Sequence, residues 1–254
     1  MESLKDWNPA LYLKFENERT RPAMELLAKI NHPMAKTYTD IGCGPGNSTA
    51  LLYALAPEAK ITGLDNSPEM LARARENLPA CQFENADIAT WKPDSKQDVI
   101  FANASMQWIP NHQHVFPHLV QQLSAEGVLA VQMPDNWGEY THTLMRQVAA
   151  EFDCADSERE ALLTINEYYD LLTAAGCDVD IWRTTYFHVM PSIQAIVDWR
   201  SGSGMRLYLQ ALTSQQRERF LERYSSLLNE HYPAQADGNR VMAFPRLFIV
   251  ARKK

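Results

Sequence analysis

Cysteine is rare in this sequence, and its spacing fits no metal site. The four cysteines, Cys43, Cys81, Cys154 and Cys177, include no Cys-x-x-Cys pair and have no histidine at metal-ligand spacing. The pattern predicts no disulfide framework either. We therefore expect reduced cysteines in the core and no bound metal.

Long apolar runs are missing as well. A helix that spans a bilayer needs about 20 consecutive apolar residues, and no uninterrupted run in this sequence comes near that length. The first residues, MESLKDWNPALYLKFENERTRP, do not show the basic and then apolar pattern of a signal peptide. These features predict a cytoplasmic protein without a membrane partner.

Positive charge is in deficit. The chain has 24 lysines and arginines against 31 aspartates and glutamates, which gives a formal net charge of -7 at pH 7. Nucleic acids and anionic membranes repel an acidic protein unless a local basic patch compensates, so neither is an expected partner. An anionic small molecule would need arginines gathered at its site.

The remaining composition is that of an ordinary globular protein. Of the 254 residues, 46% are apolar and 22% are charged, far from disordered, collagen-like or coiled-coil compositions. At roughly 150 residues per domain, this length lies between one large domain and two small ones. We expect a single domain over residues 1–254 that carries an elaboration.

Strand and helix patterns alternate over the first half of the chain. Strands are predicted at residues 37–41, 60–65, 81–87, 98–104 and 128–134, with helices between most of them. This alternation predicts an α/β fold, with a doubly wound and mostly parallel sheet that has helices on both sides.

The second half of the chain has a more helical pattern. Apolar spacing predicts helices over residues 144–152 and 168–175, then a strand over 178–190 and a last strand over 246–254. Two helices are expected within 191–232, where Thr213 and Gln216 fit a capping box. We interpret 191–232 as a helical cap insertion, although a dimer contact or simple packing stays open.

Glycine is scarce, but it is concentrated at one point. Three of the 10 glycines, Gly42, Gly44 and Gly46, alternate directly after the first predicted strand and before a helix. Glycine admits positive φ angles and lets a ligand touch the backbone. Asp65 ends the second predicted strand, where a carboxylate can accept hydrogen bonds from ribose hydroxyls. Together these features predict a cofactor site.

The glycine spacing argues against a nicotinamide dinucleotide. That fingerprint is Gly-x-Gly-x-x-Gly, whereas the residue three positions beyond Gly44 is Asn47 and the third glycine comes one position earlier. The stretch DIGCGPGNS, with Asp65 closing the next strand, resembles the class I S-adenosylmethionine-dependent methyltransferases instead. The resemblance implies a Rossmann-like fold and a loop that lies against the methionine part of S-adenosylmethionine, which has no pyrophosphate.

The same resemblance assigns further residues to the cofactor. In NADIATW, Asp87 and Ile88 stand where members of the superfamily hold the adenine, and Asn103 in VIFANASMQW stands where they line the path from donor to acceptor. Considered alone, Asp87 could cap a helix and Asn103 could belong to a turn. The full set of implied cofactor residues is Asp40, Gly42, Gly44, Gly46, Asp65, Asn66, Asp87, Ile88 and Asn103.

Stretches along nearly the whole chain resemble one family within this superfamily, the trans-aconitate methyltransferases. These stretches include DWNPALYLKFENERTRPA, ITGLDNSPEML, VLAVQMPDNW, DIWRTTY and FPRLFIVAR. The resemblance implies methyl transfer from S-adenosylmethionine to one carboxylate of trans-aconitate, with a monomethyl ester and S-adenosylhomocysteine as products. Because a carboxylic acid is already ionised at pH 7, this reaction requires no general base.

A polycarboxylate acceptor calls for arginines, since the planar guanidinium matches a carboxylate bidentately. Aromatic walls are also expected, because residues just beyond the fourth and fifth strands lie where open α/β sheets bind ligands. The N-terminal segment, residues 1–30, is predicted to be a lid. The candidates for acceptor binding are Tyr12, Arg19, Arg21, Trp108, Trp137, Arg183 and Arg246. For each of them, a surface ion pair or ordinary packing stays open.

Other functions also stay open. A different carboxylate acceptor, such as a malonyl group on a carrier protein, would predict an exposed basic groove. A quinone-type acceptor would need a base, for which HQHVFPH offers His112, His114 and His118. A non-catalytic module that binds S-adenosylmethionine could have the same fold, because fold alone does not prove turnover. A homodimer is a further possibility.

Overall fold

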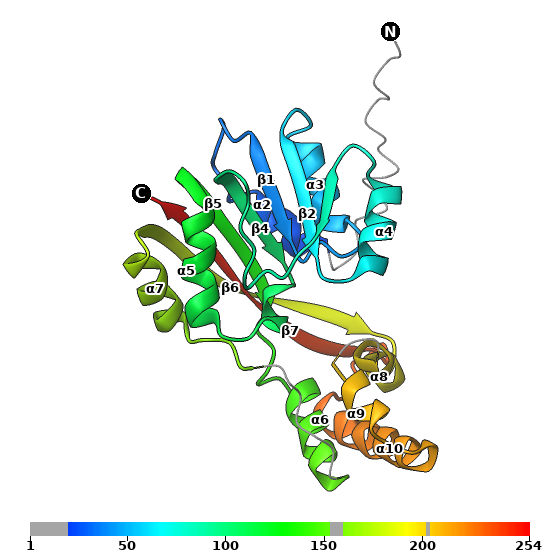
Figure 1. Ribbon diagram of the computed structural model, residues 1–254. Coiled ribbons are helices and arrows are strands. Elements are labelled where there is room, and N and C mark those ends of the chain that lie inside the picture. Colours follow the sequence, from blue (N-terminus) through cyan, green and yellow to red (C-terminus); the bar gives the residue numbers. More distant parts are fainter. Residues whose placement is uncertain (1–19, 153–159, 202–203) are drawn as a thin grey trace. The chain divides into compact units, whose positions relative to one another are not determined.

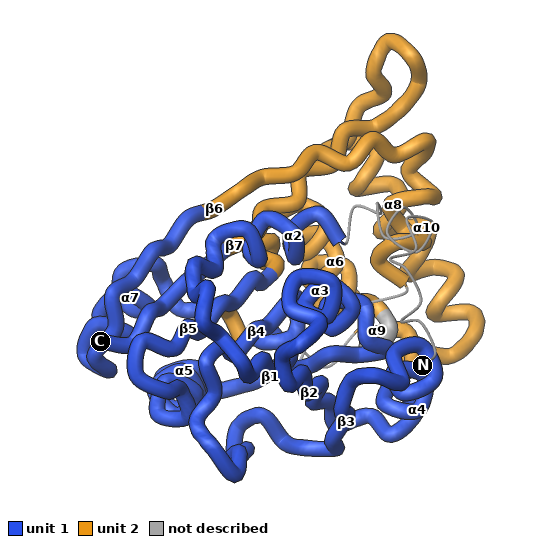
Figure 2. Tube along the Cα trace, turned by 90° about the horizontal axis from the view of Figure 1, so that it is seen from above, with its two compact units in different colours: residues 1–133, 163–182, 248–254 blue, residues 134–162, 183–247 orange. Residues whose placement is uncertain are grey.

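The computed structural model describes residues 20–152, 160–201 and 204–254. These residues divide into two compact units (Figure 2). The first unit comprises residues 1–133, 163–182 and 248–254, and the second comprises residues 134–162 and 183–247. No helix among the described residues is long and apolar enough to cross a membrane.

A seven-stranded sheet with the strand order β3-β2-β1-β4-β5-β7-β6 organises the chain (Figure 1). Its strands are β1 (Thr37–Ile41), β2 (Lys60–Asp65), β3 (Gln82–Asn85), β4 (Gln97–Asn103), β5 (Leu123–Pro134), β6 (Cys177–Met190) and β7 (Arg240–Lys253). The pairings β1 with β2, β1 with β4, β2 with β3 and β4 with β5 are parallel. The predicted parallel sheet is therefore confirmed.

Parallel strands place their carboxyl ends at one edge of the sheet, and the register shows which residues meet there. Ile41 pairs with Leu64 on β2, directly before the glycine loop on one strand and Asp65 on the other. Asn103 ends β4, the strand on the other side of β1. The predicted cofactor residues therefore follow neighbouring strands at this edge, where open α/β sheets bind ligands.

Helices on both sides of the sheet complete the first unit. They are α2 (Arg21–Leu27), α3 (Asn47–Leu55), α4 (Pro68–Asn77), α5 (His112–Gln122) and α7 (Ile165–Ala174). Figure 1 shows α5 and α7 on one side of the sheet and α2 and α3 on the other. Helix α4 begins as predicted, because the Ser67 side chain accepts from the Met70 amide and Pro68 occupies the first turn.

The second unit is built around helices. These are α6 (Tyr140–Glu151), α8 (Ile193–Ser201), α9 (Arg206–Gln210) and α10 (Ser214–His231). The predicted capping box is confirmed, because Thr213 and Gln216 exchange both of its hydrogen bonds at the start of α10. The core of the second unit includes Phe220, Tyr224 and Leu228 from the apolar face of α10, which pack with residues of α6 and α8.

Two predictions for this part of the chain were wrong. Among the described residues, three helices, α8, α9 and α10, lie between β6 and β7, where two were expected. Strand β7 begins at Arg240 rather than at Arg246, because the strand runs through Pro245. Proline lacks an amide hydrogen, so it made the preceding residues look like a loop. The stretch RVMAFP is nonetheless extended, with Met242 and Phe244 in the core of the second unit.

Candidate functional site

The glycine loop follows β1, and all three of its glycines have positive φ angles. The angles are 71° at Gly42, 53° at Gly44 and 95° at Gly46. A Cβ atom built on Gly42 would lie 2.2 Å from the Cβ of Ser105, whose hydroxyl donates to the Ile41 carbonyl at 2.7 Å. A Cβ built on Gly44 would meet nothing within 4 Å. Gly42 is therefore needed for internal packing, whereas Gly44 borders open space.

The backbone amides of this loop are already used within the protein. The amides of Gly42 and Cys43 both donate to the Leu64 carbonyl, at 2.7 and 2.9 Å, and the Gly46 amide donates to the Cys43 carbonyl at 3.0 Å. The Gly44 amide donates a hydrogen bond to the Asp65 side chain. A phosphate-binding loop instead points such amides at its ligand. The geometry therefore favours a cofactor that has no pyrophosphate.

Asp65, at the end of β2, holds the glycine loop in place. Its Oδ2 accepts from the Gly44 amide at 2.9 Å, and its Oδ1 accepts from the Ser67 amide at 2.8 Å. Each carboxylate oxygen can accept more than one hydrogen bond. Asp65 can therefore organise the loop and still accept from a ligand hydroxyl. Asn66, the next predicted residue, is exposed.

Asp40 is a buried carboxyl group beneath the loop. Its Oδ2 accepts from the hydroxyls of Ser48 and Thr49 at 2.8 and 2.6 Å, while its Oδ1 is buried and has no hydrogen-bond partner. Burial raises the pKa of this carboxyl to about 6. An ionised carboxylate in this position would be stabilised by a nearby cation. This unsatisfied acceptor oxygen fits a ligand that carries a positive charge.

The other predicted cofactor residues lie on β4 and after β3. Ile88 is buried, and Asp87 is exposed, with its Oδ1 accepting from the Ala89 amide at 2.9 Å as in a helix cap or turn. Asn103 is partly buried, and its Oδ1 is shielded from solvent without a hydrogen-bond partner. An amide oxygen left in this state costs free energy unless a ligand or water satisfies it.

A short helix, η1 (Met106–Trp108), follows β4 and presents Trp108, which is 52% exposed. This segment is anchored through His112, whose Nε2 lies 2.9 Å from the Met106 carbonyl and whose Nδ1 lies 2.6 Å from the Tyr168 hydroxyl. Because a carbonyl can only accept, Nε2 carries the proton and Nδ1 accepts from Tyr168. His112 thus has a structural role.

The two other histidines of α5 are also bonded to nearby groups. A nitrogen of the His114 ring lies 2.8 Å from Oδ1 of Asn111, and Nε2 of His118 lies 2.8 Å from the Trp91 carbonyl. All three histidine candidates for a general base therefore have contacts that fix parts of the fold. This favours an acceptor that needs no base.

The predicted acceptor residues are distributed over several segments. Tyr12 and Arg19 lie outside the described residues. Arg21 is exposed and forms an ion pair with Glu25 at 2.8 Å. The guanidinium of Arg183 is paired with Asp135 at 2.5 Å. These two arginines show the surface ion pairs that the sequence left open.

Arg246 and Trp137 belong to the second unit. Arg246 is buried, with its guanidinium carbon 4.7 Å from the ring centre of Phe244 and 5.9 Å from that of Tyr186. The partly buried ring of Trp137 lies beneath the guanidinium of Arg146, at 4.2 Å. The structure thus gives Trp137 a cationic neighbour that the sequence did not indicate.

Two arginines of this unit were missed by sequence reasoning. Arg146 lies on α6, between the apolar residues whose spacing predicted that helix. Arg200 lies near the end of α8. Arg200 is only 6% exposed, although an arginine followed by a serine, as in WRS, looks like a surface residue. An arginine buried this deeply is uncommon unless it is paired or hydrogen-bonded, and no signal in the sequence separates it from exposed arginines.

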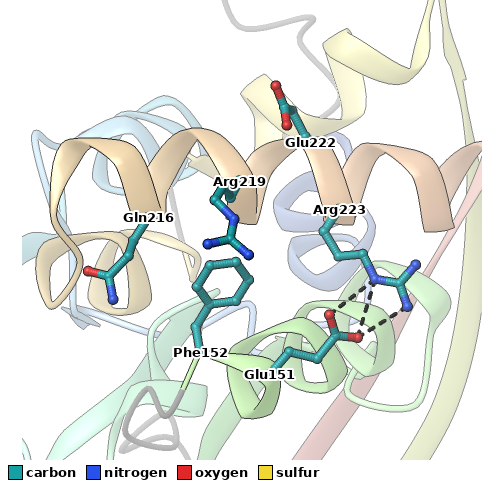
Figure 3. A pocket seen from close by; sticks show the side chains of 6 residues that line it. All are labelled: Glu151, Phe152, Gln216, Arg219, Glu222 and Arg223. Atoms are coloured by element: carbon teal, nitrogen blue, oxygen red, sulfur yellow. Dashed lines mark hydrogen bonds and ion pairs between the residues drawn. The ribbon is translucent and has the colours of Figure 1, made fainter.

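One hollow is visible on the second unit, between the end of α6 and α10 (Figure 3). It is lined by Glu151, Phe152, Gln216, Arg219, Glu222 and Arg223. The guanidinium of Arg223 is paired with Glu151, and that of Arg219 lies over the ring of Phe152. None of the predicted site residues lines this hollow. We therefore base the site on the glycine loop.

Comparison with known proteins decides the family. A sequence profile described as "Methyltransferase domain" matches residues 34–176, which include the whole glycine loop and β4. A protein from Klebsiella pneumoniae (strain 342) named trans-aconitate 2-methyltransferase is 58% identical over 250 residues, covering 98% of this chain and 99% of its own length. The chain belongs to the trans-aconitate 2-methyltransferase family. The resemblance predicted from the sequence is thereby confirmed.

Solved structures show the same fold for this family member. A putative methyltransferase from Bacillus halodurans C-125 has a TM-score of 0.63 at 12% identity, covering 92% of this chain and 99% of that one. A phosphoethanolamine N-methyltransferase from Haemonchus contortus, solved with S-adenosylhomocysteine, has a TM-score of 0.54 at 17% identity and covers 92% of this chain and 52% of its own. The fold is that of class I methyltransferases, as predicted.

Proposed function

We propose that this chain transfers a methyl group from S-adenosylmethionine to one carboxylate of trans-aconitate, which yields the monomethyl ester and S-adenosylhomocysteine. The observation that carries the proposal is the 57% identity to the trans-aconitate 2-methyltransferase of Escherichia coli O139:H28, which extends over 98% of this chain. A match of this extent includes the glycine loop, α6 and the helices of the second unit.

The residues of the glycine loop fit the proposed donor. S-adenosylmethionine, when bound, supplies an electrophilic methyl group on a sulfonium. Gly44 leaves open space beside the backbone, and Asp65 holds that backbone in place. Asp40 offers a carboxylate oxygen that no protein group satisfies, as a ligand with a cationic amino group requires. Asn103 offers a second unsatisfied oxygen at the same edge of the sheet.

The protein's task in this reaction is to position the two reactants and to exclude water. Orienting the two reactants in line is worth up to about 7–11 kcal/mol. The acceptor carboxylate is its own nucleophile at neutral pH, so the histidines of α5 are free to act as structural anchors. A dry site would strengthen the attraction between a sulfonium and a carboxylate. Trp108 and Trp137 each stay a predicted acceptor-binding residue.

The proposal places the reaction in a reducing compartment, the cytoplasm. The described cysteines Cys43, Cys81 and Cys177 are free thiols, which suits such a compartment. The predicted lid, residues 1–30, lies mostly outside the described residues, and the helices within 191–232 stay a predicted cap. A second copy of the chain is not required by any part of this proposal.

A panel of acids tests the proposal. Purified protein would be incubated with S-adenosylmethionine and each of trans-aconitate, cis-aconitate, citrate, malonate and a malonyl carrier protein, and S-adenosylhomocysteine would be measured over time. We expect kcat/KM for trans-aconitate to exceed that of every other acid by at least about tenfold. Turnover with the carrier-linked acid alone, or with none of the acids, would contradict the proposal.

A further inference from the structure

The second unit contains a continuous series of contacts between two arginines and two aromatic rings. The guanidinium of Arg146 lies over the ring of Trp137 at 4.2 Å, and that ring lies 6.2 Å from the ring of His142. Nε2 of His142 lies 2.9 Å from Nη2 of Arg200. His142 and Arg146 are four residues apart on α6 and so share one helix face.

Arg146 is held in place, but it retains a donor group. Its Nη2 donates to the Trp137 carbonyl at 3.0 Å, while its Nη1 is shielded from solvent and makes no hydrogen bond. Leaving a buried charged donor unsatisfied costs about 1–3 kcal/mol or more. The side chain as a whole is only partly buried. A bound carboxylate would satisfy Nη1 and would match the planar fork of the guanidinium, which the Trp137 ring helps to hold in place.

Arg200 supports this arrangement from within the core. Because a guanidinium can only donate, Nε2 of His142 is the acceptor, and His142 is therefore uncharged with its proton on Nδ1. Burial lowers the pKa of Arg200, and the hydroxyl-bearing rings of Tyr224, Tyr232 and Tyr208 act in the opposite direction. The buried guanidinium of Arg200 thus orients the His142 ring, which lies next to the ring of Trp137.

Two other arginines of the unit have acidic partners. Arg223 and Arg183 are paired with Glu151 and Asp135, so their charges are already compensated. In the cluster of Arg146, Trp137, His142 and Arg200, the guanidinium of Arg146 contacts the Trp137 ring and that of Arg200 contacts the His142 ring. In a chain with a net charge of -7, such a cluster is suited to an anionic ligand with more than one carboxylate.

The position of the cluster in the chain supports the same role. Trp137 lies three residues after Pro134, where β5 ends, and β5 is parallel to β4. Residues just beyond the carboxyl ends of parallel strands form the ligand sites of open α/β folds. We propose that Arg146 binds a carboxylate of the acceptor that does not react, and that Arg200 is a positioning residue acting through His142 and Trp137. This inference rests on the proposed function.

An arginine on a spectator carboxylate affects binding more than the chemical step. Arg146→Gln should raise KM for trans-aconitate about 10- to 100-fold, as the loss of a charge-assisted hydrogen bond implies, and should leave kcat within about twofold. Arg200→Lys keeps the charge and loses the planar fork, so it should raise the same KM by a smaller factor. Arg223→Gln, in the same unit, is the matched control and should leave KM unchanged.

Truncated acids identify the contact. Mesaconate, cis-glutaconate and itaconate each lack a different one of the three carboxylates of trans-aconitate. If Arg146 binds one of these groups, the penalty of Arg146→Gln in kcat/KM should nearly vanish for one truncated acid and persist for the other two. An equal penalty for trans-aconitate and all three truncated acids, or an unchanged KM for trans-aconitate, would overturn the assignment. Thermal unfolding with S-adenosylhomocysteine would verify that each variant folds and binds the cofactor product.

The outcome separates this inference from the proposed function. If the unmodified protein methylates none of the acids, calorimetry with trans-aconitate in the presence of S-adenosylhomocysteine still measures acid binding. Binding that Arg146→Gln weakens and Arg223→Gln does not would support the site while the proposed activity fails. Equal binding by the two variants would reject the site whatever the activity.

Discussion

Oδ2 of Asp65 accepts a hydrogen bond from the backbone amide of Gly44 at 2.9 Å, which ties the end of β2 to the loop that follows β1. The amides of Gly42, Cys43 and Gly46 donate to backbone carbonyls, so this bond uses the remaining amide of the glycine loop. The carboxylate thus shapes the site and also remains able to accept from a ligand. Because Asp65 has both roles, we expect its substitution to weaken cofactor binding more than the loss of a single ligand contact would.

The first prediction concerns Asp65. Asp65→Ala should weaken binding of S-adenosylhomocysteine about 100-fold or more, because it removes an acceptor for the ligand and also frees the Gly44 amide. Asp65→Asn, which can still accept from one amide through its carbonyl oxygen, should lose less. Isothermal calorimetry gives both dissociation constants, and near-normal affinity in the alanine variant would show that this carboxylate has no part in the site.

The second prediction compares two glycines with similar backbones. Gly44 and Gly176 have φ angles of 53° and 87°, and a Cβ on either would meet nothing within 4 Å. Alanine should therefore cost each position a similar strain, about 1–2 kcal/mol of stability. Only Gly44→Ala should abolish the rise in melting temperature that S-adenosylhomocysteine causes. Loss of that rise in Gly176→Ala as well would point to a general folding defect.

The third prediction concerns pH. Burial raises the pKa of Asp40 from 3.8 to about 6, so the free protein gains stability from the protonated group below pH 3.8 and loses it as pH rises through 6. A ligand with a cationic amino group favours the ionised form. Affinity for S-adenosylhomocysteine should therefore rise between pH 5 and 7 with a midpoint near 6. In Asp40→Asn this pH dependence should disappear; its persistence would exclude Asp40.

The fourth prediction concerns the absence of a base. With saturating substrates, kcat should be nearly constant from pH 6.5 to 9, and His114→Gln and His118→Gln should retain it within about twofold. Tyr168→Phe should instead lower stability by about 1–3 kcal/mol, because Nδ1 of the buried His112 loses its donor. A kcat that falls with an apparent pKa near 7 and is lost in one histidine variant would support a general base instead.

Local patterns explain why the cofactor side could be predicted. The three alternating glycines of the loop all have positive φ angles, which glycine adopts without steric cost, so the local backbone conformation explains their identity. The cap at Ser67 and the capping box at Thr213 also involve neighbours in sequence. Each of these features is decided by residues within a few positions of one another, so periodicity and spacing reveal it.

The acceptor side could not be predicted in the same way. The contact between Arg200 and His142 joins α8 to α6 across 58 positions, and only tertiary packing brings them together. Arg183 and Arg246 were equally plausible from the sequence, yet one is paired with a carboxylate and the other lies among aromatic rings. Because the partner of an arginine is set by distant residues, its role does not follow from local sequence.

The central claim, methyl transfer to a carboxylate of trans-aconitate, is tested most directly by mass spectrometry of the product. Purified protein would be incubated with trans-aconitate and S-adenosylmethionine carrying a trideuterated methyl group. We predict one new ester that contains a single labelled methyl group and forms in equal amount to S-adenosylhomocysteine. Tight binding of S-adenosylhomocysteine without any labelled ester would contradict the claim.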